Sequence, residues 1–312
     1  MGNNIAPVAI FTYNRPDHTK KALNALNDTE LASQTDLYIF CDYWKKETSK
    51  LRVGEVRNCV DAFAINSNFR NVTINKANEN RGLATSIIDG VTTIIGHYGK
   101  IIALEDDLIV SKHFLQYMNL ALEYYQNKDN IWAISGYTFP MKALEIYRHD
   151  VYTSGRACSW GWATWKDRWT VVDWNVKGYH QFKHDWIQRY KFSKWGTDLP
   201  TMLDNQMYAN INSWAIRWCY EAFKRNMLTV YPSISYITNA GNDGSGVHLS
   251  DTTKYDAIAD EKQTFSCKME TLPVDSRIRK EFKKKYSTGL YRDFKQQLKW
   301  CLIRLGLYKI KE

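Results

Sequence analysis

Three consecutive carboxylates are the clearest candidate for ligand binding or catalysis in this 312-residue sequence. Glu105, Asp106 and Asp107 lie between an apolar run at 101–104 and a second one at 108–110. Burying ionised carboxylates without a partner costs several kcal/mol, so acids beside a core strand need compensating charge. A hard divalent cation such as Mg²⁺ or Mn²⁺, itself bound to a diphosphate, would supply it. The alternative is an acidic turn at a sheet edge that pairs with basic neighbours.

The segments around these acids alternate between strand-like and helix-like patterns. Strands are predicted at 7–13, 37–42, 72–82 (with a following loop), 100–110, 131–137 and 228–237, and helices at 17–27, 83–97, 111–127 and 213–226. This alternation predicts an α/β fold with a mostly parallel central sheet flanked by helices. The acids then interrupt a buried strand near its carboxyl end, which is where open α/β sheets bind ligands.

Composition and charge exclude several classes of protein. With 44% hydrophobic residues, six prolines and sixteen glycines, the chain is neither disordered nor collagen-like. The net charge of +9 is concentrated at one end, because residues 273–312 hold 12 Lys/Arg against 4 Asp/Glu and the other 272 residues carry only +1. A nearly neutral body without a nucleic-acid-binding motif predicts no nucleic-acid partner.

The segment 273–312 is predicted to be a basic amphipathic helical tail. Apolar residues recur at helical spacing in 292–306, and 277–285 adds a second basic cluster. Such a tail (276–312) would either bind an anionic membrane surface or pack on the domain as a terminal helix. We see neither a secretion signal nor a run of about 18 apolar residues, so we expect a cytoplasmic protein, free or peripheral on the inner face of the membrane.

Tryptophans are concentrated in the second half of the chain. Nine of the twelve lie between Trp160 and Trp218. Indole rings stack well on the apolar faces of sugars, which suits an acceptor site, although most tryptophans simply pack in a core. Trp160 and Trp162, on either side of Gly161, are the predicted sugar contacts.

In their order along the chain, four segments resemble the GT-A-fold glycosyltransferases that use nucleotide sugars, including family 2 and the N-acetylglucosaminyltransferase I group. They are VAIFTYNRPDHTKKALNAL (8–26), Asp42, NENRGLATSIIDGV (78–91) and LEDDL (104–108). Three further segments resemble bacterial sugar transferases of surface-polysaccharide synthesis, namely GWATWKDRW (161–169), SWAIRW (213–218) and GNDGSGVH (241–248). The resemblance covers about 7–250. It implies a GT-A domain at 1–272, with a nucleotide-sugar half at about 1–137 and an acceptor half at about 138–272.

The resemblance also implies a metal site. Asp107 would ligate Mn²⁺ or Mg²⁺, Asp106 would contact the ribose or a metal-bound water, and Glu105 would lie near the ribose. The metal would bridge the two phosphates and stabilise charge on the departing nucleoside diphosphate. His248 ends a glycine-rich loop and would complete the metal shell, unless it is simply an exposed loop residue.

A nucleotide pocket is implied beside the metal, with a UDP-sugar as the favoured donor. Its residues would be Thr12, Tyr13, Asn14, Arg15, Asp42 and Arg81. Asp42 would lie against the base, and Arg15 is suited to phosphate or carboxylate contact, because its planar fork matches the oxygens of both groups. The alternatives are a core role for Tyr13 and a helix-end charge for Arg81.

An inverting transferase also needs a carboxylate near the acceptor hydroxyl, to take its proton. In the N-acetylglucosaminyltransferase I group an acid precedes a tryptophan and an arginine, and the matching residues here are Asn212, Trp214 and Arg217. We expect the tryptophan and the arginine at the acceptor site. Asparagine cannot act as a base, which leaves Asp204, the preferred candidate, and Glu221. For Glu221 the alternative is an ion pair with Arg217, four residues earlier.

The leading hypothesis is therefore a metal-dependent glycosyltransferase that builds a bacterial surface polysaccharide. It would move a sugar from a nucleotide sugar to a glycan or lipid-linked acceptor, by an inverting reaction. The alternatives are a nucleotidyltransferase, a catalytically dead sugar-binding relative, and a nucleic-acid-binding protein that acts through the basic tail.

Overall fold

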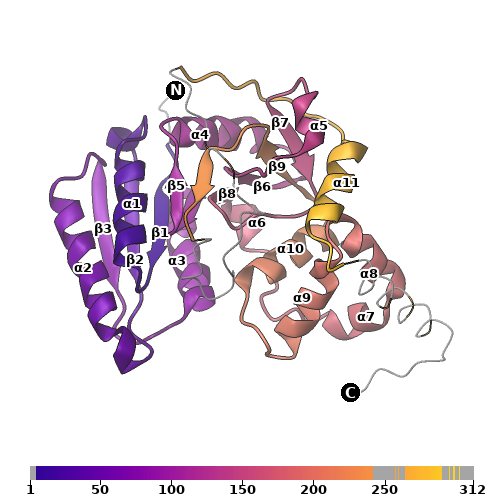
Figure 1. Cartoon of the computed structure of the whole chain (residues 1–312), viewed down its shortest axis with the longest axis horizontal. Helices are drawn as coiled ribbons and strands as arrows, with labels where there is room; N and C mark the ends of the chain where they lie inside the picture. The colour runs from indigo at the N-terminus through magenta and orange to yellow at the C-terminus, as the bar shows by residue number, and fades with distance from the viewer. Residues whose placement is uncertain are drawn as a thin grey trace.

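The computed structural model describes residues 5–241, 257, 259, 264–289, 295, 298 and 302. Within these residues the chain forms one eight-stranded sheet and one two-stranded sheet (Figure 1). The strands of the large sheet, in chain order, are β1 (Val8–Thr12), β2 (Asp36–Cys41), β3 (Asn71–Lys76), β4 (Lys100–Glu105), β6 (Ile131–Ser135), β7 (Val151–Ser154), β8 (Trp162–Trp165) and β9 (Leu228–Pro232). The small sheet pairs β5 (Leu108–Val110) with β10 (Ile237–Asn239).

The large sheet is mixed, with its parallel part in the N-terminal half. Its strand order is β3-β2-β1-β4-β8-β6-β9-β7. Strands β3, β2, β1 and β4 are parallel neighbours, and β9 is parallel to β6. Strand β8 runs antiparallel between β4 and β6, and β7 runs antiparallel at the edge. The prediction of an α/β fold with a large, mostly parallel sheet flanked by helices is confirmed.

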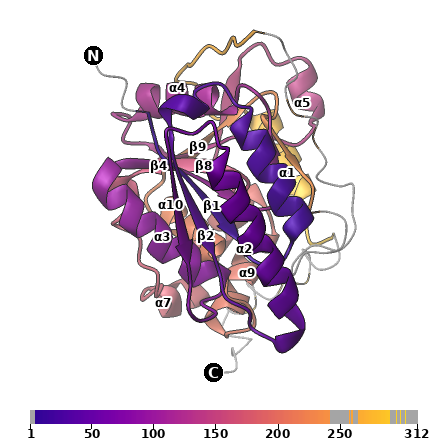
Figure 2. The same ribbon diagram turned by 90° about the vertical axis from the view of Figure 1, so that its left-hand side faces the viewer.

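Helices cover both faces of the parallel half (Figure 2). They are α1 (Pro16–Asn27), α2 (Lys50–Ile65), α3 (Leu83–Tyr98) and α4 (Phe114–Tyr125). Val8 and Ile10 of β1 belong to the core that includes α1, α2 and α4, whereas Ala9 and Phe11 belong to the core that includes α3. Successive side chains of a strand point to opposite faces, so an unbroken apolar run is what a strand covered on both sides requires.

An aromatic core fills the C-terminal half, where several helices gather (Figure 1). They are α6 (Lys166–Trp169), α7 (Tyr179–His184), α8 (Trp186–Phe192), α9 (Asp198–Met207) and α10 (Trp214–Lys224). Helix α5 (Lys142–Glu145) lies apart from them, and its buried Ala143 belongs to the core that includes β1. Indole rings pack against one another here, with ring centroids from 4.3 to 6.4 Å apart: Trp132, Trp162, Trp169, Trp174, Trp214 and Trp218. These tryptophans join β6, β8, α6 and α10 into one layer of the protein.

Helix α11 (Ser276–Lys285) packs on the domain through its apolar face. Ile278 and Phe282 are both 0% exposed and belong to the core that includes β1. The carboxylate of Glu281 accepts hydrogen bonds from the backbone N–H groups of Lys142 and Ala143 at the start of α5. The first part of the predicted tail is thus built into the fold, as one of the two interpretations predicted.

The remainder of that tail, apart from 295, 298 and 302, lies outside the described residues. Among the residues that the structure does describe, no helix combines the length and the apolar character that crossing a membrane demands.

The strand predicted at 100–110 is two strands. β4 ends at Glu105, a turn at Asp106 and Asp107 follows, and β5 begins at Leu108 and pairs with β10. The three acids therefore do not interrupt one strand: Glu105 is the last residue of β4, and Asp106 and Asp107 form the turn that follows it.

Candidate active site

The site lies at the carboxyl edge of the three neighbouring strands β2, β1 and β4. Parallel strands present the loops that follow them at the same edge, and this is where open α/β sheets bind ligands. The loop after β1 carries Tyr13, Asn14 and Arg15, the loop after β2 begins with Asp42, and β4 ends in the acidic turn. Segments far apart in the sequence meet here because the sheet places their strands side by side.

Asp106 is the central acid of the turn and is only 3% exposed. Its Oδ1 lies 2.6 Å from Nη2 of Arg15, and its Oδ2 accepts hydrogen bonds from the backbone N–H of Tyr13 at 3.2 Å and from Oγ1 of Thr19 at 3.4 Å. Burial raises the pKa of Asp106, against the attraction of Arg15. The loop after β1 and the start of α1 thus hold both oxygens of this carboxylate.

Asp107 shares the same guanidinium nitrogen. Its Oδ2 lies 3.0 Å from Nη2 of Arg15, and its backbone carbonyl accepts a hydrogen bond of 2.9 Å from the N–H of Ala240, just after β10. The chain passes so close at Gly241 that a Cβ there would collide with the Asp107 carboxylate. The contacts of Ala240 and Gly241 with Asp107 were not predicted from the sequence. The signal that could have indicated them is the glycine at 241, because a residue without a Cβ allows the backbone to approach another group closely.

The acidic turn holds more negative charge than one guanidinium neutralises. Burial, together with Asp107 and Asp106, raises the pKa of Glu105 to about 8, although Arg15 acts in the opposite direction. Burial lowers the pKa of Arg15, but the attraction of Asp106 and Asp107 outweighs this and holds it above its ordinary value. The sequence allowed two interpretations of the acids, a metal site and a turn paired with a basic neighbour. The pairing with Arg15 is part of the structure. The remaining negative charge would still attract a further cation.

A divalent cation fits the geometry of the turn through two oxygens. Asp106 Oδ1 and Asp107 Oδ2 both lie within 3.0 Å of one nitrogen atom, so they converge on one point. Across the described ranges, no three His, Cys, Asp or Glu side chains gather as a metal-binding group. The other ligands would be water and phosphate oxygens, which Mg²⁺ commonly keeps. His248, the predicted additional ligand, lies outside the described residues.

Asp42 ties the loop after β2 to the start of α3. Its Oδ1 accepts a hydrogen bond of 2.9 Å from the N–H of Arg81, and its Oδ2 accepts bonds from the N–H of Gly82 at 2.9 Å and from Nδ2 of Asn80 at 3.0 Å. A carboxylate at a helix N-terminus satisfies N–H groups that have no partner within the helix. The buried Asp42 therefore shapes this loop; its predicted contact with a base stays a prediction.

The other predicted nucleotide contacts lie around the same edge. Thr12 is buried and donates to the carbonyl of Phe40. The hydroxyl of Tyr13 accepts a hydrogen bond of 3.1 Å from the N–H of Lys45, so this half-buried ring bridges the loops after β1 and β2. Asn14 is half-buried at the bend between β1 and α1.

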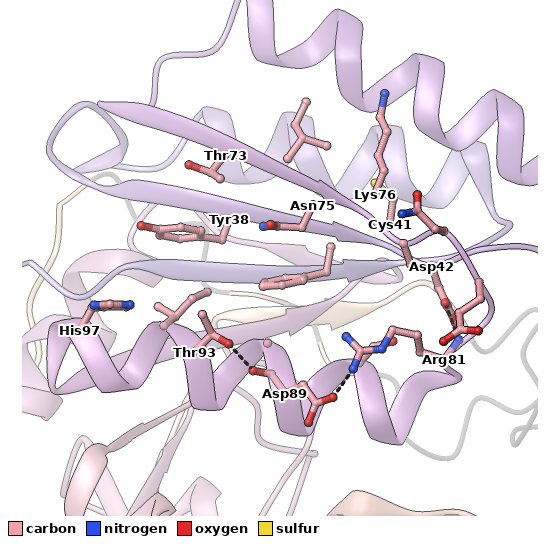
Figure 3. A pocket seen from close by; sticks show the side chains of 18 residues that line it. Tyr38, Cys41, Asp42, Thr73, Asn75, Lys76, Arg81, Asp89, Thr93 and His97 are labelled. Atoms are coloured by element: carbon pink, nitrogen blue, oxygen red, sulfur yellow. Dashed lines mark hydrogen bonds and ion pairs between the residues drawn. The ribbon is translucent and has the colours of Figure 1, made fainter.

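Arg81 lies at one end of a long groove beside α3. Its guanidinium forms an ion pair with Asp89 of that helix. The groove, with a volume of about 940 Å³, runs between α3 and the uncovered face of β2 and β3, from Asp42 and Arg81 to Tyr38 and His97 (Figure 3). Thr73 and Asn75 of β3 contribute to its polar lining, which was not predicted from the sequence.

The two carboxylates considered as a catalytic base both form ion pairs. Asp204 of α9 accepts two hydrogen bonds from Arg189, at 2.8 and 2.6 Å. Glu221 of α10 is 3% exposed and pairs with Arg225 at 2.8 Å and Lys224 at 3.1 Å. The ion pair expected for Glu221 thus exists, but with different partners, of which Lys224 is the last residue of α10 and Arg225 follows it directly.

Residues 212–217 are held together as a helix start. Arg217 donates to the side chain of Asn212 at 3.2 Å, and to the carbonyls of Ser213 at 3.1 Å and Trp174 at 3.2 Å. Asn212 is exposed. Their predicted catalytic and acceptor roles stay predictions.

The tryptophans predicted to contact the acceptor separate into two groups. Trp162 is 2% exposed and Trp214 is 3% exposed, and their ring centroids lie 5.0 Å apart in the aromatic core. Neighbouring side chains largely cover both rings in this structure, and their predicted place at the acceptor site stays a prediction. Trp160 is half-buried and packs edge-on against Tyr137 at 4.6 Å, so its predicted role stays open to test.

Comparison with known proteins gives likenesses to solved structures only. No family model and no curated protein sequence matches the chain. Among solved structures, the chain is similar to S. aureus TarS 1–349, with a TM-score of 0.42 and 9% sequence identity, over 74% of this chain and 59% of that chain. The chain thus spans about three fifths of the length of that neighbour. A likeness this distant says nothing about activity.

Proposed function

We propose that this protein is a metal-dependent glycosyltransferase. It would transfer a sugar from a nucleotide sugar, with UDP as the favoured nucleotide, to a glycan or lipid-linked acceptor in the synthesis of a bacterial surface polysaccharide. The reaction proposed is inverting. The proposed location is the cytoplasm or, through the basic residues of 276–312, the inner face of the cytoplasmic membrane.

One observation carries the proposal. Asp106 and Asp107 converge at the carboxyl end of β4, and the loops that follow the two neighbouring strands β1 and β2 surround them. A nucleoside diphosphate needs positive charge at its phosphates, and a carboxylate pair at a sheet edge can hold a cation for that purpose.

The proposed roles follow from the positions of the side chains. Asp107 and Asp106 would hold Mn²⁺ or Mg²⁺, which when bound supplies charge stabilisation for the leaving diphosphate. Arg15 would bind phosphate oxygens through its planar fork. Asp42 and Tyr13 would shape the wall of the nucleotide pocket, since their hydrogen bonds fix the loops after β1 and β2.

The test is the variant Asp107→Asn, assayed with a panel of UDP-, GDP- and CMP-sugars in the presence of Mn²⁺. We expect sugar-nucleotide hydrolysis and transfer to fall by about 100-fold or more, the size of effect that removing a charge-stabilising group has. The thermal midpoint should stay nearly unchanged, because Arg15 keeps its ion pair with Asp106 when the charge of Asp107 is removed.

Asp61→Asn is the matched control, because Asp61 is also an ion-paired carboxylate but lies on α2, paired with Lys76. Its activity should equal that of the wild type. Full activity in Asp107→Asn would contradict the proposal. Release of pyrophosphate from nucleoside triphosphates would instead identify a nucleotidyltransferase.

A further inference from the structure

The strongest further observation is the position of a single nitrogen atom. Nη2 of Arg15 lies 2.6 Å from Asp106 Oδ1 and 3.0 Å from Asp107 Oδ2. The three side chains are 17%, 5% and 16% exposed, so this bridge lies largely out of water. Partly buried charge pairs are screened much less by salt than surface pairs.

The surrounding structure holds the two carboxylates in this arrangement. The second oxygen of Asp106 accepts hydrogen bonds from the Tyr13 N–H and from Thr19, so this carboxylate cannot rotate away without losing them. Asp107 is fixed through its backbone by Ala240, and Gly241 closes in beside it. A cation that binds both Asp106 Oδ1 and Asp107 Oδ2 would compete with Arg15 for the same two oxygen atoms.

We propose that Arg15 is a built-in competitor of the divalent cation. In the nucleotide-free protein its guanidinium occupies the cation position between Asp106 and Asp107. A nucleoside diphosphate draws the guanidinium onto its phosphate oxygens, and the two carboxylate oxygens become free for metal. This inference rests on the proposed function, because it deepens the role of the same site.

The competition has a thermodynamic consequence. A ligand that removes Arg15 from the carboxylates increases their affinity for the cation, and by linkage the cation increases the affinity for that ligand equally. The guanidinium suits this exchange, because its fork forms strong hydrogen bonds with carboxylate and phosphate alike. Metal and nucleotide would then bind together, and the protein without nucleotide would bind metal weakly.

The test measures Mn²⁺ binding to the full chain without nucleotide, by the loss of the electron paramagnetic resonance signal of free Mn²⁺. We expect Arg15→Met to bind Mn²⁺ about tenfold more tightly than the wild type, within the range of coupling typical between linked sites. Arg15→Gln keeps an amide donor toward the carboxylates and is the second variant, in case Arg15→Met does not fold. Circular dichroism and the thermal midpoint establish which variants are folded.

The matched control is Arg70→Met. Nη2 of Arg70 lies 2.6 Å from Oδ2 of the buried carboxylate Asp36. This ion pair is at the amino end of β2, the end opposite to the acidic turn. The Arg70→Met substitution removes the same positive charge but frees a single carboxylate, and not a pair that shares one cation. The Mn²⁺ affinity of this variant should therefore equal that of the wild type. Tighter binding in this variant would show that net charge alone is responsible.

Folded Arg15 variants that bind Mn²⁺ no more tightly than the wild type would overturn the proposal, as would an absence of Mn²⁺ binding in every variant. The measurement involves no sugar donor. A chain without transferase activity can therefore still show the competition, and an active transferase can still lack it.

Discussion

At the scale of single residues, Asp204 was predicted to be a catalytic base, and in the structure it forms an ion pair with Arg189. Both of its oxygens accept hydrogen bonds from Arg189, at 2.8 and 2.6 Å, and Tyr179 donates a third bond of 3.0 Å. The side chain of Arg189 is only 4% exposed. Removing one partner of such a pair leaves a buried charge without compensation. We therefore expect Asp204→Asn to lower the free energy of unfolding by about 3 kcal/mol, measured by urea denaturation.

A catalytic role for Asp204 predicts a different pattern. A base that acts without a structural role would lose turnover on substitution while the urea midpoint stayed that of the wild type. Asp61→Asn, a surface ion pair, should change stability by less than about 1 kcal/mol and serves as the control. A stable, inactive Asp204→Asn would support the assignment of Asp204 as the base.

The positions of the acids could be predicted from the sequence, but their partners could not. A carboxylate after a buried parallel strand must lie at the carboxyl edge of the sheet, and Asp106 and Asp107 do. Arg15 was expected to contact phosphate or a carboxylate, but nothing in the sequence indicated that it would bridge these two acids. The approach of Gly241 depends on the pairing of β10 with β5, and such a pairing between distant segments leaves no local periodicity in the sequence.

At the scale of elements, the contact between α3 and the sheet depends on one glycine. A Cβ at Gly90 would lie 2.9 Å from Phe11 and 3.0 Å from Phe40, in a place where ring atoms cannot retreat easily. We expect Gly90→Ala to lower the free energy of unfolding by about 1–3 kcal/mol, the usual cost of overpacking a core. Because α3 also lines the groove and begins beside Asp42, its displacement should be visible as a reduced affinity for nucleotide.

Gly96 on the same helix provides the control, because substitution by alanine there should change the free energy of unfolding in the opposite direction. It is exposed, and a Cβ there would meet no atom within 4 Å. Alanine is a better helix former than glycine by up to about 1 kcal/mol, so Gly96→Ala should stabilise the protein slightly. Equal effects of the two substitutions in a denaturation experiment would mean that helix propensity, and not contact with the sheet, decides the cost at Gly90.

Most elements of the N-terminal half match their predicted segments. Strand β8, in the second half of the chain, was not predicted, and this has a physical cause. Strand β8, Trp162–Trp165, has only four residues and lies in an aromatic segment that could equally be helical. It becomes a strand because it inserts antiparallel between β4 and β6, whose residues come from earlier parts of the chain. Tertiary pairing therefore overrides the local pattern, and the same insertion buries Trp162.

At the scale of the whole molecule, the first part of the basic C-terminal segment, α11, belongs to the folded domain. The charge count alone suggested a tail that begins at 273, but Ile278 and Phe282 interrupt the basic residues of α11 four positions apart and face the core. Arg156 completes the attachment, since it pairs with Asp198 at 2.9 Å and its guanidinium lies 3.8 Å from the ring centroid of Tyr286. A segment can thus be strongly basic and still be part of the folded domain.

This attachment predicts that the protein cannot lose α11 and remain stable. Phe282 is fully buried, with its ring centroid 4.9 Å from that of Phe139 and 5.4 Å from that of Tyr231. Phe282→Ala should lower the free energy of unfolding by about 3–5 kcal/mol, as removal of a buried aromatic ring does. Lys280→Ala, on the exposed side of the same helix, should change it by less than about 0.5 kcal/mol. Equal urea midpoints for the two variants would mean that α11 is a detachable tail, and deletion from residue 276 onward would then leave a stable domain.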